Sequence, residues 1–212
     1  EMCIRDSDTA ADYLSDTGVL EDPAKAYLQR TMVGGKSATS TEIRALGAIN
    51  PLVTDTGLAR SLHCDVTGPM PDTAQSWAAG RQLGDYYLTH IYLETIFQRE
   101  LGCQLPVDAA FLQGLAADVA KLIRAGDYAT DLEMEAAWFL ALGGEGQRIP
   151  ATFLDDVVRS TYADGGWGVN LGVSGSDPHA TALATVLLFD ATHPATHGVL
   201  GLGPPLTAVG VP

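Results

Sequence analysis

Three stretches of the chain share one pattern, an aspartate followed by a run of mostly apolar residues. Asp85, Asp131 and Asp177 begin these stretches and stand 46 residues apart. The run after Asp131 contains no polar residue from Ala136 to Leu142, which predicts a helix that is buried on all sides. A fixed spacing of this size is typical of stacked helix pairs, in which one pair cannot bury its apolar face alone.

The segments between these stretches are apolar on one side only. Apolar residues recur at intervals of three and four within residues 106–123 and 150–159, which is typical of half-exposed helices. Residues 73–101 form the longest helical candidate, which we expect to break near Gly80 to Gly84. This alternation of inner and outer helices predicts an all-α fold, an α/α toroid-like array of helical hairpins with a period of about 46 residues. A toroid is normally closed by more hairpins than are visible here, so an incomplete array is one interpretation of this pattern.

The chain divides into three expected parts. Residues 1–7 lack an initiator methionine at position 1 and resemble a translated sequencing adaptor, so we expect them to be non-native. Residues 8–191 are expected to form a single domain, followed by a Gly- and Pro-rich tail at 192–212 that no helix rule supports. Within the domain, a short helix is expected at 55–63 and a loop at 66–72. Thr39 with Glu42 fits a capping box at an earlier helix.

Composition limits the classes of partner. The net charge of −14, from 26 acidic and 12 basic residues, argues against nucleic acid, because phosphate binding depends on clustered Lys and Arg. No run approaches the ~18 apolar residues that a membrane-spanning helix needs. Cys3, Cys64 and Cys103 are odd in number and far apart, which indicates neither a disulfide framework nor a CxxC metal site. We therefore expect unpaired cysteines and a cytoplasmic, reducing location.

One loop and the helix after it carry a motif. Asp164-Gly165-Gly166-Trp167-Gly168 precedes Asp177-Pro178-His179, which is similar to the repeat signature of squalene and hopene cyclases, a glutamine and DGSWG followed by an inner helix that begins with Asp. With the helix alternation, residues 131–190 resemble the α/α toroid of terpene cyclases and of protein prenyltransferase β subunits. The resemblance implies a central cavity and cyclase- or transferase-like chemistry. The catalytic motifs are not matched: Thr161 replaces the glutamine, DxDD is absent, and His63-Cys64-Asp65 lacks the prenyltransferase zinc spacing.

Two interpretations of the three aspartates are open. Aspartate is a preferred N-cap, because its carboxylate accepts a free N–H of the first turn and faces the positive end of the helix dipole. In a toroid the inner helices run parallel, so the three heads would instead gather at one mouth of the cavity, where carboxylates raise a pKa or share a cation. The residues four positions further on, Thr89, Glu135 and Thr181, then form a second polar layer on the same helix faces.

Glu135 and two histidines are further candidates. Glu135 precedes the apolar run, and a buried glutamate costs on the order of several kcal/mol unless it is paired or protonated. It therefore either lines a cavity or pairs with a cation. His90 stands four residues before Glu94, and His179 two after Asp177. A histidine near carboxylates can act as a general base or a metal ligand, or can be satisfied structurally by a neighbour.

The function expected from these patterns is the binding of a small, largely apolar ligand in a terpenoid-cyclase-like domain, degenerate in its motifs, with acid/base chemistry at the inner-helix mouth. The candidate catalytic residues are Asp131, Glu135, Asp177, His179 and His90. No residue is assigned to a cofactor or to a metal. Two alternatives stay open, a non-catalytic helical repeat module that binds a protein partner and a fragment of a larger enzyme. Trp167 is interpreted as the anchor of the loop between two helix pairs.

Overall fold

The fold is built from helices. The computed structural model describes residues 40–45, 54–68, 70–124, 126, 128–169 and 175–192, and within these ranges helices and loops occur without a β-strand. The prediction of an all-α fold is confirmed for this part of the chain. The helices are α3 (Ser40–Ala45), α4 (Thr54–Ser61), α5 (Cys64–Thr67), α6 (Thr73–Leu83), α7 (Asp85–Glu100), α8 (Ala109–Ala120), α9 (Asp131–Leu142), the 3-10 helix η3 (Gly146–Arg148), α10 (Phe153–Arg159) and α11 (Pro178–Thr192).

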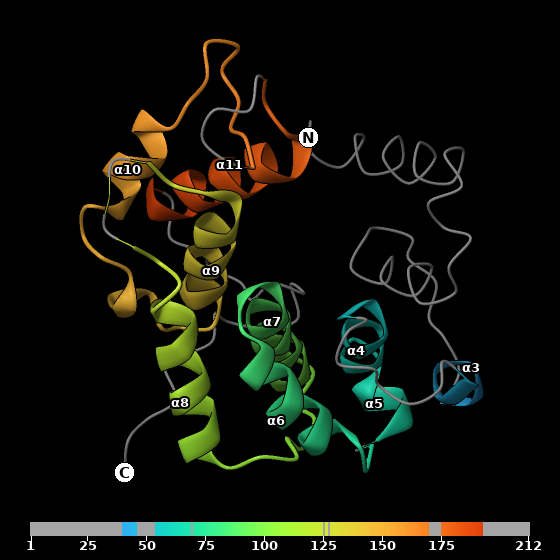
Figure 1. Cartoon of the computed structure of the whole chain (residues 1–212). Helices are drawn as coiled ribbons and strands as arrows, with labels where there is room; N and C mark the ends of the chain where they lie inside the picture. The colour runs from blue at the N-terminus through green and yellow to red at the C-terminus, as the bar shows by residue number, and fades with distance from the viewer. Residues whose placement is uncertain are drawn as a thin grey trace.

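The helices α7, α9 and α11 lie next to one another, with α9 in the middle (Figure 1). Their N-terminal residues meet at the site described below. Towards the C-terminal ends, Arg99 Nη1 donates to the Gly143 carbonyl at 3.3 Å, and Trp138 Nε1 donates to Asp190 at 3.2 Å. Neighbouring helices therefore run in the same general direction, as expected of inner helices. A toroid with a 46-residue period stays a prediction, because these contacts establish the order of neighbouring helices and not a ring.

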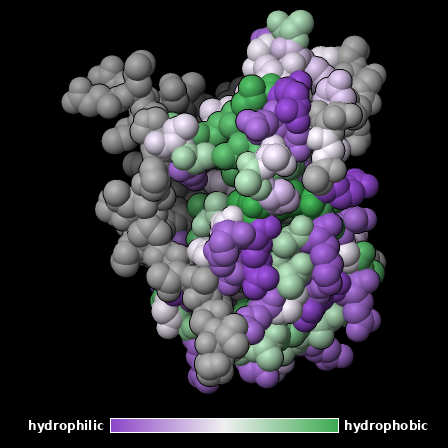
Figure 2. Space-filling view, turned by 90° about the vertical axis from the view of Figure 1, so that its left-hand side faces the viewer, coloured by the Kyte–Doolittle hydropathy of each residue, from purple (hydrophilic) through white to green (hydrophobic). Residues whose placement is uncertain are grey.

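One apolar core joins α6 to α11. Apolar side chains of α8 and α10 pack against those of α7 and α9, so the half-exposed helices cover the buried ones as the pattern predicts. Figure 2 shows the face on which α8 and α10 lie, where polar side chains cover much of the surface and an apolar area is exposed between them. The fully buried core side chains include Trp77, Ile96, Leu115, Val119, Met134, Leu140, Phe153 and Val157.

The helix α11 is less buried than a third inner helix was expected to be. It buries Ala180, Leu183, Ala184 and Leu187, but Phe189 is 57% exposed. The buried positions recur at intervals of three and four, so they form one stripe facing α9. Among the described residues, α11 therefore buries one side only.

The helix boundaries follow the expected signals closely. Gly84, with a φ of 74°, separates α6 from α7 as predicted for the break near 80–84. The N-cap of α8 is Asp108, whose side chain accepts the Phe111 N–H at 2.8 Å, so this helix begins three residues after the proline that was expected to open it. The loop expected at 66–72 begins later, because Val66 and Thr67 belong to α5.

Some expectations concern residues outside the described ranges. These are the non-native segment at 1–7, Thr39 of the capping pair with Glu42, and the tail at 192–212 apart from Thr192, which ends α11. The sequence also predicted no membrane-spanning helix, and none of the described helices combines the length and the apolar character that a bilayer span requires.

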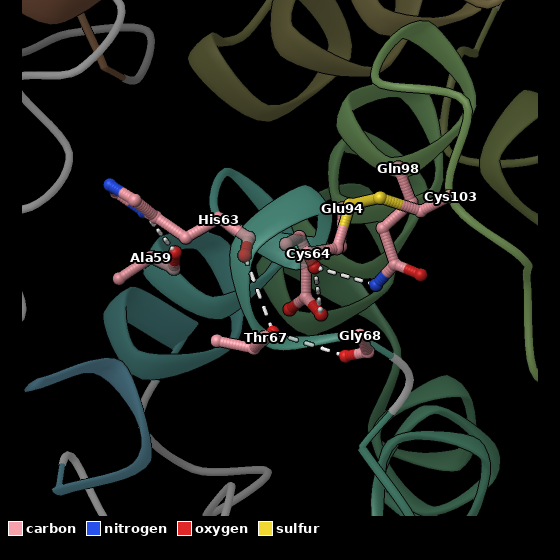
Figure 3. The surroundings of a disulfide bond; sticks show 9 residues. Ala59, His63, Cys64, Thr67, Gly68, Glu94, Gln98 and Cys103 are labelled. Carbon is pink, nitrogen blue, oxygen red and sulfur yellow. Dashed lines mark hydrogen bonds between the residues drawn. A yellow bond between two sulfur atoms is a disulfide. The ribbon is translucent and has the colours of Figure 1, made fainter. Parts of the chain in front are cut away.

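The expectation of unpaired cysteines is wrong. Cys64 and Cys103 form a disulfide across 39 residues of sequence, with their Cα atoms 6.1 Å apart (Figure 3). Sequence spacing could not reveal this pair, because the two residues approach only when α5 packs beside the end of α7. The expectation of a reducing, cytoplasmic location loses the support that unpaired cysteines gave it, because disulfides persist mainly in oxidising compartments.

Candidate functional site

The first turns of α7, α9 and α11 meet around the carboxylate of Asp131. The Tyr86 hydroxyl on α7 donates to Asp131 Oδ2 at 2.6 Å, and His179 Nδ1 on α11 lies 2.9 Å from Asp131 Oδ1. The Asp131 side chain is only 5% exposed, whereas that of His179 is 59% exposed. One buried carboxylate thus connects three helices, and the imidazole beside it is open to solvent.

The carboxylate of Asp131 is available because another residue caps α9. Thr130 is the N-cap, its side chain accepts the Glu133 N–H at 3.4 Å, and Glu133 Oε2 accepts the Thr130 N–H at 2.8 Å. This is a capping box. The prediction that Asp131 caps its own helix is therefore wrong, because the preceding threonine already satisfies the free N–H groups.

The other two aspartates differ from each other. Asp177 Oδ1 accepts the N–H groups of His179 and Ala180 at 2.9 and 3.1 Å, so the capping interpretation is confirmed for Asp177. It is wrong for Asp85, because Gly84 occupies the N-cap position of α7 without a side-chain cap. Asp85 stands in the first turn with a φ of 47° and is exposed, and it does not join the Asp131 cluster.

Glu135 lies one turn below Asp131 and is 1% exposed. Thr89 donates to Glu135 Oε1, across the 46-residue interval of the sequence pattern. His90 Nδ1 lies 3.6 Å from the same oxygen, and His179 Nε2 lies 3.7 Å from Glu135 Oε2. The expected second polar layer is therefore present for Thr89 and Glu135.

The remaining member of that layer is used differently. Thr181 Oγ1 accepts the Trp167 N–H at 3.0 Å, and Trp167 Nε1 donates to the Val157 carbonyl at 2.7 Å. Trp167 thus fixes the Gly-rich loop to α10 and α11, which confirms its interpretation as an anchor. His90 and Glu94 also separate, because Glu94 turns away from the cluster towards Trp77.

Burial and hydrogen bonding shift the pKa values of these groups in opposite directions. Burial pushes the pKa of Asp131 upward, but the hydrogen bonds from His179 and Tyr86 outweigh it and leave that pKa below its ordinary value. Burial raises the pKa of Glu135, and the nearby His90, Thr89 and His179 offset this only in part. The hydrogen bond to Asp131 raises the pKa of His179 despite its partial burial. Burial and the hydrogen bond to Asp131 likewise raise the pKa of Tyr86. One carboxylate with a lowered pKa and one with a raised pKa therefore flank a single imidazole.

The carboxylates have histidines as their charged partners. Among the described residues, Asp131 and Glu135 pair with His179 and His90, and no arginine or lysine pairs with either. A histidine can gain or lose its charge near neutral pH, whereas arginine and lysine stay charged there. The net charge of this cluster can therefore change near neutral pH. A different use of the same groups is coordination: Asp131, Asp177 and His179 bring one donor atom each within 4.8 Å of one another, which matches the spacing around a single cation.

Two residues that contact Asp131 have partly exposed side chains with apolar surface. Tyr86 and Val169 are 38% and 39% exposed, and the Val169 carbonyl accepts the Asp131 N–H at 3.4 Å. An apolar cleft of about 230 Å³ lies elsewhere, between the C-terminal parts of α9 and α11 and the segment that leads into α10. Glu135 does not line that cleft. Its carboxylate instead contacts Thr89, His90 and His179.

Comparisons with known proteins add no family to this picture. The chain matches no protein-family model, no curated protein and no solved structure. The resemblance to terpene cyclases and prenyltransferase β subunits therefore gains no support from them. The assignment of the candidate site is therefore based on the geometry of its residues alone.

The structure thus brings together four of the five candidate residues, Asp131, Glu135, His179 and His90, and places Asp177 beside them as the cap of α11. Tyr86 was missed. The signal that could have identified it is its position three residues before Thr89 and four before His90, which places all three on one face of α7.

Proposed function

We propose that the cluster of Asp131, His179 and Glu135 is an acid/base centre that acts on a small, largely apolar ligand at the shared N-terminal mouth of α7, α9 and α11. The observation that carries this proposal is the position of the exposed His179 ring between two buried carboxylates, with Nδ1 2.9 Å from Asp131 and Nε2 3.7 Å from Glu135. Such an arrangement orients an imidazole and sets its proton affinity.

Each group has a distinct role in this proposal. Asp131 accepts the Nδ1–H of His179, which fixes the tautomer and leaves the lone pair of Nε2 to take a proton from a ligand O–H or N–H group. The imidazolium that forms is stabilised by Asp131, and the proton returns to the ligand from Nε2. Glu135, whose pKa is raised by burial, holds or releases a proton beside the same nitrogen.

The ligand class follows from the surroundings of the ring. Tyr86 and Val169 present partly exposed apolar surface beside Asp131, which suits an apolar body with one polar group directed at His179. The terpenoid-cyclase-like chemistry implied by the sequence resemblance is the specific form of this proposal. Since DxDD is absent, protonation would depend on the present cluster.

The proposal is tested by NMR on the histidine side chains. In the wild type, the pKa of His179 should lie above its ordinary 6.5, and Asp131→Asn should return it towards that value because the bond at Nδ1 is weakened. Farnesol, octylamine and limonene serve as apolar probes with different polar groups. At least one should shift the His179 and Tyr86 signals in the wild type and much less in Asp131→Asn. Absence of any shift with all three probes would contradict the ligand class.

A bound metal ion is the competing use of the same residues. Zn²⁺ and Mn²⁺ are titrated separately while thermal stability is followed. If either ion stabilises the wild type, and if Asp131→Asn, Asp177→Asn and His179→Gln each remove that stabilisation, coordination replaces proton transfer as the interpretation. No stabilisation by metal, with the elevated pKa of His179 observed, supports the acid/base centre.

Exposed apolar residues favour a second candidate function. Phe189 on α11 and Val158 on α10 are 57% and 56% exposed, which fits the alternative of a non-catalytic helical module that binds a protein partner. This alternative, like that of a fragment of a larger enzyme, does not use the cluster. Phe189→Ser should weaken partner binding under this alternative and leave the response of His179 to the small probes unchanged.

A further inference from the structure

The helices α4 and α5 contact the rest of the domain through a small apolar cluster of their own. Leu58 of α4 and Leu62, which directly follows α4, pack with Phe97 of α7 in a second apolar cluster, which meets the main core only at the partly buried Leu93 among the described residues. Figure 1 shows α3, α4 and α5 on one side of α7, with α8 and α9 on the other side. Within the described part of the chain, this second cluster has three buried side chains, whereas the main core has 21, so it holds α4 on α7 less strongly than the main core holds α6 to α11 together.

Polar contacts between α4 and α7 add to the attachment. The Ser61 hydroxyl of α4 donates to Glu94 Oε2 at 3.4 Å and accepts from Gln98 Nε2 at 3.0 Å. Arg60 pairs with Asp72 in the loop before α6 at 3.0 Å. These contacts are few, and an intramolecular hydrogen bond replaces one to water, so their net stabilisation is small.

The Cys64–Cys103 disulfide joins the same two parts covalently. Cys64 is the first residue of α5, and Cys103 follows α7, where its N–H donates to the Gln98 carbonyl at 2.8 Å. Figure 3 shows the disulfide beside Gln98 and Glu94. A small cavity of about 20 Å³ borders both cysteines, a volume sufficient for about one water molecule.

We propose that this disulfide is a redox-controlled latch that holds α4 and α5 on α7. A dithiol reductant would supply two electrons and two protons. The Cys64–Cys103 bond breaks, each sulfur takes one proton to become a thiol, and the reductant is oxidised to its own disulfide. Without the bond, α4 and α5 depend on a small apolar cluster and a buried carboxylate contact, which places them at the low-stability end of the fold.

Opening of the latch has a defined structural result. It uncovers the side of α7 that carries Glu94 and Phe97, while the main core of α6 to α11 is not connected through the disulfide. The contacts of the Asp131 cluster come from α7, α9 and α11, so this inference does not depend on the proposed function. Reduction would expose the side of α7 that carries Glu94 and Phe97 and would leave the contacts of the Asp131 cluster in place.

Hydrogen exchange measured by mass spectrometry tests the latch on the full chain. All variants carry Cys3→Ser, so that the third cysteine cannot exchange with the pair. Addition of a dithiol should accelerate amide exchange about tenfold or more in α4, α5 and residues 93–98, with α9 and α11 unchanged. The control Cys64→Ser/Cys103→Ser should show the fast pattern without reductant and no response to it.

Two results would overturn the proposal. Unchanged exchange after complete reduction, verified by thiol labelling, would mean that the noncovalent contacts hold α4 and α5 by themselves. Loss of protection in α9 and α11 together with α4 would make the disulfide a staple of the whole fold and not a local latch. If the double serine variant fails to fold, reduction of the folded parent chain gives the same comparison.

Discussion

Substitution of Glu94 by glutamine is expected to remove much of the pH dependence of stability between about pH 5 and pH 8. Glu94 is 3% exposed, and its carboxylate accepts Trp77 Nε1 at 2.7 Å and Ser61 Oγ at 3.4 Å. Burial raises its pKa from 4.5 to about 8, while the hydrogen bonds from Trp77 and Ser61 and the charge of Arg60 act in the opposite direction.

The sign follows from proton binding in the two states. Above 4.5 the unfolded chain releases a proton that the folded chain keeps up to about 8, so stability is complete below the unfolded pKa and falls as the pH rises through this window. Each pH unit within the window corresponds to roughly 1.4 kcal/mol. The free energy of unfolding should therefore fall by about 4 kcal/mol between pH 5 and pH 8 through this residue alone.

Urea denaturation at several pH values, followed by tryptophan fluorescence, measures this effect. Glutamine resembles the protonated acid, so the wild type and Glu94→Gln should have similar stability near pH 5. Above that pH, Glu94→Gln should become progressively more stable than the wild type. Glu100→Gln, on the same helix at a partly exposed position, controls for removal of a carboxylate. A stability difference between wild type and Glu94→Gln that stays constant across the range would refute the reasoning.

Three further substitutions test two other places in the fold, each by thermal denaturation, where 1 kcal/mol corresponds to roughly 2–4 °C for a chain of this size. Among the described residues the buried Tyr92 hydroxyl has no hydrogen-bond partner, so Tyr92→Phe should stabilise by up to about 1 kcal/mol, and a loss of stability would reveal a partner. A Cβ at Gly143 would collide with the Tyr92 hydroxyl, so Gly143→Ala should destabilise by about 1–3 kcal/mol, and a neutral result would mean that the ring moves freely. Thr130→Ala removes the capping box with Glu133 and should cost about 1 kcal/mol, and no cost would show that Glu133 caps α9 by itself.

The helices could be predicted because their signals are local. The run from Ala136 to Leu142 and the polar start at Asp131 defined α9 over residues 131–142, as the structure has it. The break at Gly84 was equally readable, because glycine adopts the φ of 74° found there without strain. The burial of α11 was overestimated. Its apolar composition resembles that of α9, but burial depends on which elements pack against it.

The sequence predicted which residues belong to the site, but it did not predict what each residue does there. The 46-residue interval indicated that the starts of α9 and α11 lie side by side, and Asp131, Glu135 and His179 do meet there, whereas Asp85 at the start of α7 does not join them. The 46-residue spacing does not reveal which residue caps each helix. Thr130 caps α9, which leaves the Asp131 carboxylate available for Tyr86 and His179, whereas Asp177 caps α11. The disulfide was missed for a related reason, since residues 39 apart in sequence become neighbours only through tertiary packing.

The common direction of α7, α9 and α11 also affects the electrostatics of the mouth. The N-terminus of each helix carries roughly half a positive charge from its aligned peptide dipoles. Three such ends meet where Asp131 and Glu135 are buried among histidines, so backbone dipoles supply part of the positive potential that arginine or lysine would supply elsewhere. The acidity of the cluster therefore depends on how well the first turns are formed. A substitution that unwinds the start of α11 should change the proton affinity of His179 even though it touches none of the titrating groups.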